Sequence, residues 1–403
     1  MGSPSRRQFL GGWEPDPEEE IPSRPGEVWP PMRRVSLTPE VTVVLVLLLA
    51  FGVAVFRFQK CLEPAIHSND LPRQIYYGQI AREKGLAEAG TPLGVHYPDL
   101  IEAGWHHKPY NYPPVFLTFF AGGTLLGTSL FFWKVLLTLM EGLNAILLGR
   151  LTRSWWLGLL YWATPSSIWW VSHEGQPDPL QNLLILGALL FTQQAVFART
   201  GARVAAFLLL GLAIQVKLFA VLLLPCFLWR LREPGARALP LLALVASGLP
   251  SLVAQFHYPM LSCVLDTLSY NNFTVFGWRT LPHPMASFHF KAIFWTMQSA
   301  HYLAMLLCLV GVLWTRRWTE FLAPATLLLM LRFMAATRPW YPLVFPALAA
   351  PVGQGPPDSP LARRLRLALL VLWPLMDLYS LIHFPSPESH VLLNPFAPLI
   401  LPR

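Results

Sequence analysis

The sequence predicts an all-α polytopic integral membrane protein. Of its 403 residues, 54% are hydrophobic and only 13% are charged, whereas charged residues make up about a quarter of an ordinary soluble domain. The basic residues lie in small clusters between long apolar stretches, and the chain has 16 tryptophans and 25 phenylalanines, as expected for segments that meet the lipid interface. These observations exclude an ordinary cytosolic domain. The net charge is +8, but the basic residues do not form one stripe along the chain. We therefore do not expect the protein to bind nucleic acid.

The N-terminal part of the chain sets the orientation of the predicted spans. Residues 1–40 are polar and rich in proline, so we expect a disordered cytosolic tail. Arg33 and Arg34 precede the apolar stretch 41–58, which is the predicted first span, and the positive-inside rule keeps both arginines in the cytosol. Residues 59–130 are therefore expected to form a large first outer loop with interfacial helices.

Later clusters of basic residues place the remaining spans. The clusters that should face the cytosol are Arg150/Arg153, Arg199/Arg203, Arg230/Arg232/Arg237, Arg316/Arg317 and Arg363/Arg364/Arg366. Each interval between them must contain an even number of crossings, which gives about eleven membrane segments in all. The predicted divisions are membrane helices over 131–256, with successive spans at 131–149, 155–172 and 179–198, a second outer loop over 257–290, C-terminal membrane helices over 291–383 and an outer tail over 384–403.

A short hairpin is predicted over 204–229, between two of these clusters. The interval contains 26 residues, whereas two complete spans need about 40 residues at about 20 per helix. The hairpin should therefore enter the membrane without crossing it twice, and Lys217 should lie near its tip. A lysine at membrane depth indicates a functional site; the alternative is that its aliphatic stem lets the ammonium reach the interface.

Polar side chains on the predicted outer side are the first candidates for a site. Asp70 opens a helix-like stretch in the first outer loop, where an aspartate either caps the helix or supplies a titratable carboxylate. His173, Glu174, Gln176 and Asp178 lie at the turn between two expected spans. They could bind a polar ligand or a cation, or they could simply form the polar turn that any such connection needs.

The remaining candidate residues are two solitary arginines and the cysteines and histidines. Arg279 and Arg338 lie on the predicted outer side, where the positive-inside rule disfavours them, so each is a candidate functional residue. The four cysteines are scattered and the histidines lack the spacing of a zinc site. No metal ligand is assigned, and a divalent cation is left open as a cofactor.

Several motifs follow one another in an order that occurs in one enzyme superfamily. They are Asp70 in a long loop after the first span, Tyr-x-x-x-Ala-Arg-Glu at 77–83, Tyr-x-Tyr-Pro-Pro at 110–114, Gly-Gln-x-Asp at 175–178 and Lys-Leu-Phe-x5-Pro at 217–225. In this order the chain resembles the GT-C glycosyltransferases. It is similar to the catalytic subunit of GPI mannosyltransferase I and to bacterial polyprenyl-phosphate-mannose mannosyltransferases. The resemblance covers residues 41 to about 230 and Arg338-Pro339-Trp340-Tyr341; an expected Asp-x-Asp reads Ser68-Asn69-Asp70.

The resemblance implies a hexosyltransferase, and mannose is the expected sugar. The donor would be a polyprenyl- or dolichyl-phosphate sugar, and the acceptor would be a hydroxyl of a glycan, glycolipid or protein at the outer or lumenal membrane face, with inversion. Asp70 would be the base, and the donor phosphate would meet Lys217, Arg279 and Arg338. The sugar or acceptor would meet His173, Glu174, Gln176, Asp178, Tyr110 and Tyr112. The protein would lie in a bacterial inner membrane or the endoplasmic reticulum, with an accessory membrane subunit as an optional partner.

Two other classes of protein remain as alternatives. A lipid-linked-sugar transporter or flippase would share the aromatic spans and a buried lysine, although transporters commonly contain internal repeats and the two halves of this chain show none. A non-catalytic membrane assembly subunit would explain the spans but would leave Asp70 and the short hairpin without a role.

Overall fold

The computed structural model describes residues 38–257 except for 65–69, 98–109, 111, 225–226, 229–230 and 232–235, and it also describes Leu303, Leu306, Leu307 and Val310. The chain divides into two compact units, Met1–Thr42 and Val43–Arg403. Most of the predicted tail 1–40 lies outside the described residues. So do nearly all of the second outer loop 257–290 and of the segments 291–383 and 384–403, with Arg279 and Arg338 among them.

All regular structure in the described residues is helical, which confirms the predicted all-α class for this part of the chain. Three helical stretches are long and apolar enough to cross a membrane. They are helix α1 (Pro39–Leu62), helix α5 (Leu130–Thr152) and the consecutive helices α12 (Ala238–Ser247) and α13 (Leu249–His257). These helices are those of a membrane protein, and the count of about eleven segments stays a prediction.

Local sequence explains the limits of the long helix α5. The hydroxyl of Ser129 accepts a hydrogen bond from the backbone N–H of Phe132, which caps the start of the helix. At the other end, Arg153 adopts a left-handed conformation with φ of 55°, and its N–H donates to the carbonyl of Arg150. This left-handed residue ends the helix by satisfying carbonyls of its last turn.

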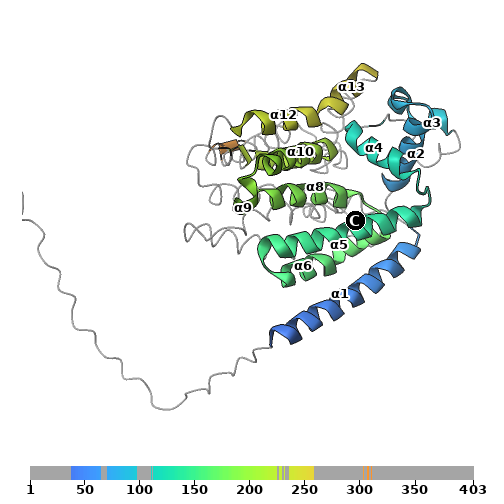
Figure 1. Ribbon diagram of the computed structural model, residues 1–403. Coiled ribbons are helices and arrows are strands. Elements are labelled where there is room, and N and C mark those ends of the chain that lie inside the picture. Colours follow the sequence, from blue (N-terminus) through green and yellow to red (C-terminus); the bar gives the residue numbers. More distant parts are fainter. Residues whose placement is uncertain are drawn as a thin grey trace, which may run out of the picture. The chain divides into compact units, whose positions relative to one another are not determined.

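Four short helices lie between α1 and α5 in the residues that the structure describes. Helix α2 covers Asp70–Glu83, the 3-10 helix η1 covers Leu86–Gly90, α3 covers Leu93–His96 and α4 covers Pro114–Gly123. Figure 1 shows α2, α3 and α4 gathered near one end of α5. Helices α2 and α4 are in close contact: a methyl group at Gly78 would lie 2.8 Å from the backbone carbonyl carbon of Phe120. Glycine is therefore needed where the two helices meet.

The stretch after α5 is an interrupted helix. A single span was expected over 155–172, but the structure has α6 (Trp155–Ala163), a short turn α7 (Pro165–Ser167) and the π-helix η3 (Ile168–His173). Thr164 has a ψ of 120°, the extended conformation favoured by a residue that precedes a proline. Pro165 therefore breaks the helix, and the wider π-helical turns carry the chain to the next loop.

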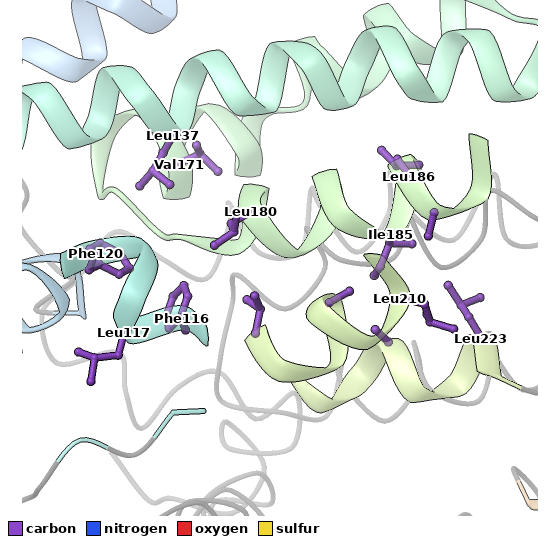
Figure 2. Close-up of a cluster of buried hydrophobic side chains, with 14 of the residues drawn as sticks. Phe116, Leu117, Phe120, Leu137, Val171, Leu180, Ile185, Leu186, Leu210 and Leu223 are labelled. Atoms are coloured by element: carbon purple, nitrogen blue, oxygen red, sulfur yellow. The ribbon is translucent and has the colours of Figure 1, made fainter. Parts of the chain in front are cut away.

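The following helices pack in sequence against one another. Helix α8 (Asp178–Phe191) contacts α5 and α10 (Thr200–Val216), and α10 also contacts α12, with the short helix α9 (Gln194–Phe197) between α8 and α10. Figure 2 shows buried hydrophobic side chains that join these elements: Leu137 of α5 lies beside Val171 of η3, and Ile185 of α8 lies near Leu210 of α10 and Leu223. One continuous core therefore holds the ends of these helices in place.

Candidate functional site

The turn between η3 and α8 is buried, although a polar connection between two spans is normally exposed. His173, Glu174, Gln176 and Asp178 are each at most 1% exposed. The backbone N–H of Glu174 donates to the carbonyl of Trp169, and that of Gln176 donates to the carbonyl of Trp170, at 2.9 and 2.7 Å. Burying polar groups is unfavourable unless they are paired. The buried polar side chains of this turn therefore make it a candidate functional site.

Gly175 brings this turn against the beginning of α2. Its φ is +76°, and a methyl group at this position would lie 2.3 Å from Cδ2 of Leu71. Both the left-handed backbone and the close approach require glycine. Leu71 directly follows Asp70, which is the first residue of α2. The first turn of the helix that Asp70 begins therefore packs against the buried polar turn.

An ion pair joins this turn to the predicted short hairpin. The ammonium of Lys217 donates to Oδ1 of Asp178 at 2.5 Å, and the two side chains are 11% and 0% exposed. Helix α10 ends at Val216, Lys217 has an extended backbone, and the 3-10 helix η4 (Leu218–Leu223) follows. The amide of Gln181 donates to the carbonyl of Lys217 at 2.6 Å. Two residues that the sequence analysis chose separately therefore lie in direct contact.

A row of titratable side chains leads from the turn to the end of α1. Nδ1 of His173 lies 2.8 Å from Oε1 of Glu174, and Nε2 lies 3.4 Å from Oε2 of Glu63. The ammonium of Lys60 donates to both carboxylate oxygens of Glu63, at 2.7 and 3.0 Å. This hydrogen bond, more than any other interaction, lowers the pKa of Glu63. Lys134 donates to the backbone carbonyl of Glu63 at 2.6 Å.

The tyrosines of the Tyr-x-Tyr segment belong to an aromatic cluster with α2. Tyr110 is 1% exposed, and its ring meets that of Tyr77 edge-on at a centroid distance of 5.3 Å. Tyr112 is partly buried and lies 6.1 Å from the ring of Tyr110 and 5.1 Å from that of Phe116. The guanidinium of Arg73 lies 6.0 Å from the ring centroid of Tyr112. Both tyrosines thus join the start of α4 to α2, the helix that Asp70 begins.

Sequence reasoning missed a buried charge beneath the site, that of Arg57. Its guanidinium is 0% exposed and donates to the carbonyl of Trp162 at 2.7 and 2.9 Å, to Oγ of Ser167 at 2.9 Å and to Oγ of Ser172 at 3.0 Å. It also lies 4.1 Å from the ring centroid of Trp162. Arg57 therefore joins α1 to both sides of the interruption between α6 and η3.

Glu141 of α5 completes this network. Its side chain is 0% exposed and accepts hydrogen bonds from the Tyr161 hydroxyl at 2.7 Å, the Ser167 hydroxyl at 2.5 Å and the Asn144 amide at 3.1 Å. Asn182 of α8 in turn donates to the Tyr161 hydroxyl at 3.1 Å. Ser167 contacts both Arg57 and Glu141, so a hydrogen-bonded path crosses from α1 to α5 and α8. In the sequence, Arg57 and Glu141 could have been recognised as ionisable residues inside apolar stretches, which indicates a functional or structural role.

The arrangement provides cations, carboxylates and aromatic rings around one buried turn, and it provides no evident metal centre in the part of the chain that is described. Among the described residues, no three histidine, cysteine, aspartate or glutamate side chains are placed to hold a metal ion. Comparisons with protein-family models, with curated proteins and with solved structures find no match to this chain. The functional interpretation therefore depends on the chemistry of these residues and on the order of the motifs.

Proposed function

We propose that this protein is a GT-C-type glycosyltransferase. It moves a hexose, with mannose as the first candidate, from a polyprenyl-phosphate carrier to an acceptor hydroxyl at the outer or lumenal face of the membrane, with inversion. Asp70 is the proposed base, and Lys217 is a proposed contact of the donor phosphate. Arg279 and Arg338 stay candidates for further phosphate contacts, and the acceptor is a glycan, glycolipid or protein.

The observation that carries the proposal is that motif segments far apart in the sequence come together. Gly175 packs against Leu71 at the start of α2, and Asp178 pairs with Lys217 at the end of α10. Tyr110 packs against Tyr77 of α2. The segments that begin at Asp70 and Lys217 thus both contact the buried turn, as the parts of one substrate site would, and Tyr110 lies against the same helix α2.

The chemistry expected of such a site matches the residue types gathered there. The oxygen of the acceptor hydroxyl attacks the anomeric carbon, and a carboxylate accepts the hydroxyl proton in the transition state. Phosphate leaves with the electron pair of the broken C–O bond, so it needs a nearby positive charge more than it needs an acid. Lys217, held by the buried carboxylate of Asp178, can supply that charge.

Three outcomes distinguish this proposal from its alternatives. Membranes that contain the protein would be incubated with radiolabelled polyprenyl-phosphate mannose and a panel of octyl glycosides as acceptors. A glycosyltransferase transfers the label to an octyl glycoside and releases polyprenyl phosphate. A flippase moves the labelled lipid between leaflets without breaking its glycosyl bond, and an assembly subunit does neither.

A variant of Asp70 tests the role of the proposed base. Asp70→Asn retains an amide oxygen that can cap a helix but cannot accept a proton, so turnover should fall by about 10²-fold while folding is retained. Glu88→Gln is the matched control, because Glu88 lies in the same loop with a side chain that is 46% exposed and should leave turnover unchanged. Substantial turnover in a folded Asp70→Asn protein would contradict the assignment.

A further inference from the structure

Two hydrogen bonds hold the chain on either side of the buried turn 173–178. Before the turn, the guanidinium of Arg57 donates to Oγ of Ser172 at 3.0 Å. After the turn, the amide of Asn144 donates to the backbone carbonyl of Pro179 at 3.0 Å. Arg57 and Asn144 belong to α1 and α5, two helices that are long enough to cross a membrane. The turn is therefore held between contacts with two spans.

Glu141 joins these two contacts into one network. Its carboxylate accepts a hydrogen bond from the amide of Asn144 at 3.1 Å and one from the hydroxyl of Ser167 at 2.5 Å. Oγ of Ser167 in turn accepts from the guanidinium of Arg57 at 2.9 Å. Arg57 and Glu141 are both fully buried, and a buried charge is costly unless an opposite charge compensates it. Each of the two groups therefore depends on the other.

We propose that Arg57 and Glu141 are positioning residues for the phosphate contact of Lys217. Asp178 ends the turn and directly precedes Pro179, and its carboxylate accepts from the ammonium of Lys217 at 2.5 Å. A shift of the turn would move the Asp178 carboxylate, and the ammonium that it holds would move with it. The inference rests on the proposed function, in which Lys217 meets the phosphate of the lipid donor. Arg57 and Glu141 act through the turn and do not touch the donor.

The guanidinium of Arg57 is itself held in place, as a positioning residue requires. Its Nε and Nη2 donate to the backbone carbonyl of Trp162 at 2.9 and 2.7 Å. The guanidinium also lies 4.1 Å from the ring centroid of Trp162. The planar fork of an arginine can bind this carbonyl and both serines, Ser167 and Ser172, at once. Arg57 therefore transmits the position of α1 to the residue just before the turn.

A double variant that removes both charges separates positioning from stability. Arg57→Met alone leaves the Glu141 carboxylate buried without compensation, so the midpoint of thermal unfolding should fall. Arg57→Met/Glu141→Gln has no lone buried charge, and its midpoint should return close to that of the parent. The contact with Ser172 is still missing. Binding of farnesyl phosphate, a short prenyl phosphate, would be measured by calorimetry on the full-length protein in detergent. Kd of the double variant should be about 10-fold higher, the effect of one poorly aimed charge-assisted hydrogen bond.

Three further variants make the test specific. In a Lys217→Met background, the same double change should not raise Kd again, because its effect passes through the ammonium of Lys217. Ser172→Ala keeps both buried charges and should raise Kd about 3-fold. The matched control is Thr152→Ala at the other end of α5, where the hydroxyl donates to the carbonyl of Leu148 in the same helix at 2.7 Å. Kd of this control should equal that of the parent.

Each failure has a different meaning. A stable double variant with the Kd of the parent would overturn the positioning role, and so would an equal further loss of affinity in the Lys217→Met background. If the double variant does not fold, an unchanged Kd for Ser172→Ala overturns the proposal. A parent that binds farnesyl phosphate but transfers no sugar contradicts the proposed glycosyltransferase, while the Kd values still decide the positioning role. A parent that does not bind farnesyl phosphate overturns the phosphate contact of Lys217, and the positioning role with it.

Discussion

Breaking the ion pair between Asp178 and Lys217 should destabilise the protein substantially. Removing one partner of a buried pair costs about 3–5 kcal/mol, because the other charge stays buried without compensation. Asp178 is 0% exposed and Lys217 is 11% exposed, so water can reach the lysine slightly. We therefore expect about 3 kcal/mol for Lys217→Met, which leaves the carboxylate buried. Asp178→Asn should cost less, because the remaining ammonium is the more exposed partner.

A double-variant cycle tests this reasoning directly. The free energy of unfolding would be measured in detergent for the parent, both single variants and the double variant Asp178→Asn/Lys217→Met. The double variant has no lone buried charge, so its loss of stability should be at least about 1 kcal/mol smaller than the sum of the single losses. Additive losses, or a loss below about 0.5 kcal/mol for Lys217→Met, would refute the buried pair.

Three further predictions concern the turn, the end of α1 and the membrane topology. Gly175 has a φ of +76° and no room for a methyl group, so Gly175→Ala should lower the free energy of unfolding by about 2 kcal/mol. Gly201→Ala, at an open position, should not destabilise the protein. Equal midpoints of thermal unfolding for the two variants would contradict this. A hydrogen bond from a lysine in the last turn of α1 lowers the pKa of Glu63, so its stabilising effect is present above about pH 4.5 and is lost at lower pH. The difference in unfolding free energy between parent and Glu63→Gln should accordingly shrink from about pH 6 to about pH 3, and a constant difference would oppose it. A reporter fused after Arg237 should lie in the cytosol and one at Gly104 outside, and cytosolic labelling at Gly104 would invert the topology.

Composition and apolar stretches were sufficient to predict the helical membrane class. The stretches expected to span at 41–58 and 131–149 lie within α1 (Pro39–Leu62) and α5 (Leu130–Thr152). The ends of α5 depend on local signals, the Ser129 cap and the left-handed Arg153, and a hydropathy profile does not contain these signals. Element class was therefore easier to predict than element ends.

The interruption at Pro165 shows what hydropathy could not provide. The stretch 155–172 is largely apolar, so a continuous span was expected, but Thr164 adopts an extended conformation and a π-helix follows at 168–173. The proline was visible in the sequence. The sequence did not show that Ser167, just after the break, would donate to Glu141 of α5 and accept from Arg57 of α1.

The candidate site was predictable in its residue types but not in its pairings. Asp178 and Lys217 were each selected from local position, and no local pattern indicates that they form an ion pair. The turn of His173 was expected to be polar, but no local pattern showed that it is buried and packs against α2 at Gly175. Long-range contacts of this kind require the fold itself.

The most direct test of the account follows the glycosyl bond of the donor. Purified protein in liposomes would receive polyprenyl-phosphate mannose labelled in the sugar, and polyprenyl phosphate and labelled glycoside would be measured together. We expect equal amounts of both products, an inverted anomeric centre, and a loss of about 10²-fold in rate for Asp70→Asn. Labelled lipid that crosses the bilayer with its glycosyl bond intact, or equal rates for parent and Asp70→Asn, would contradict it.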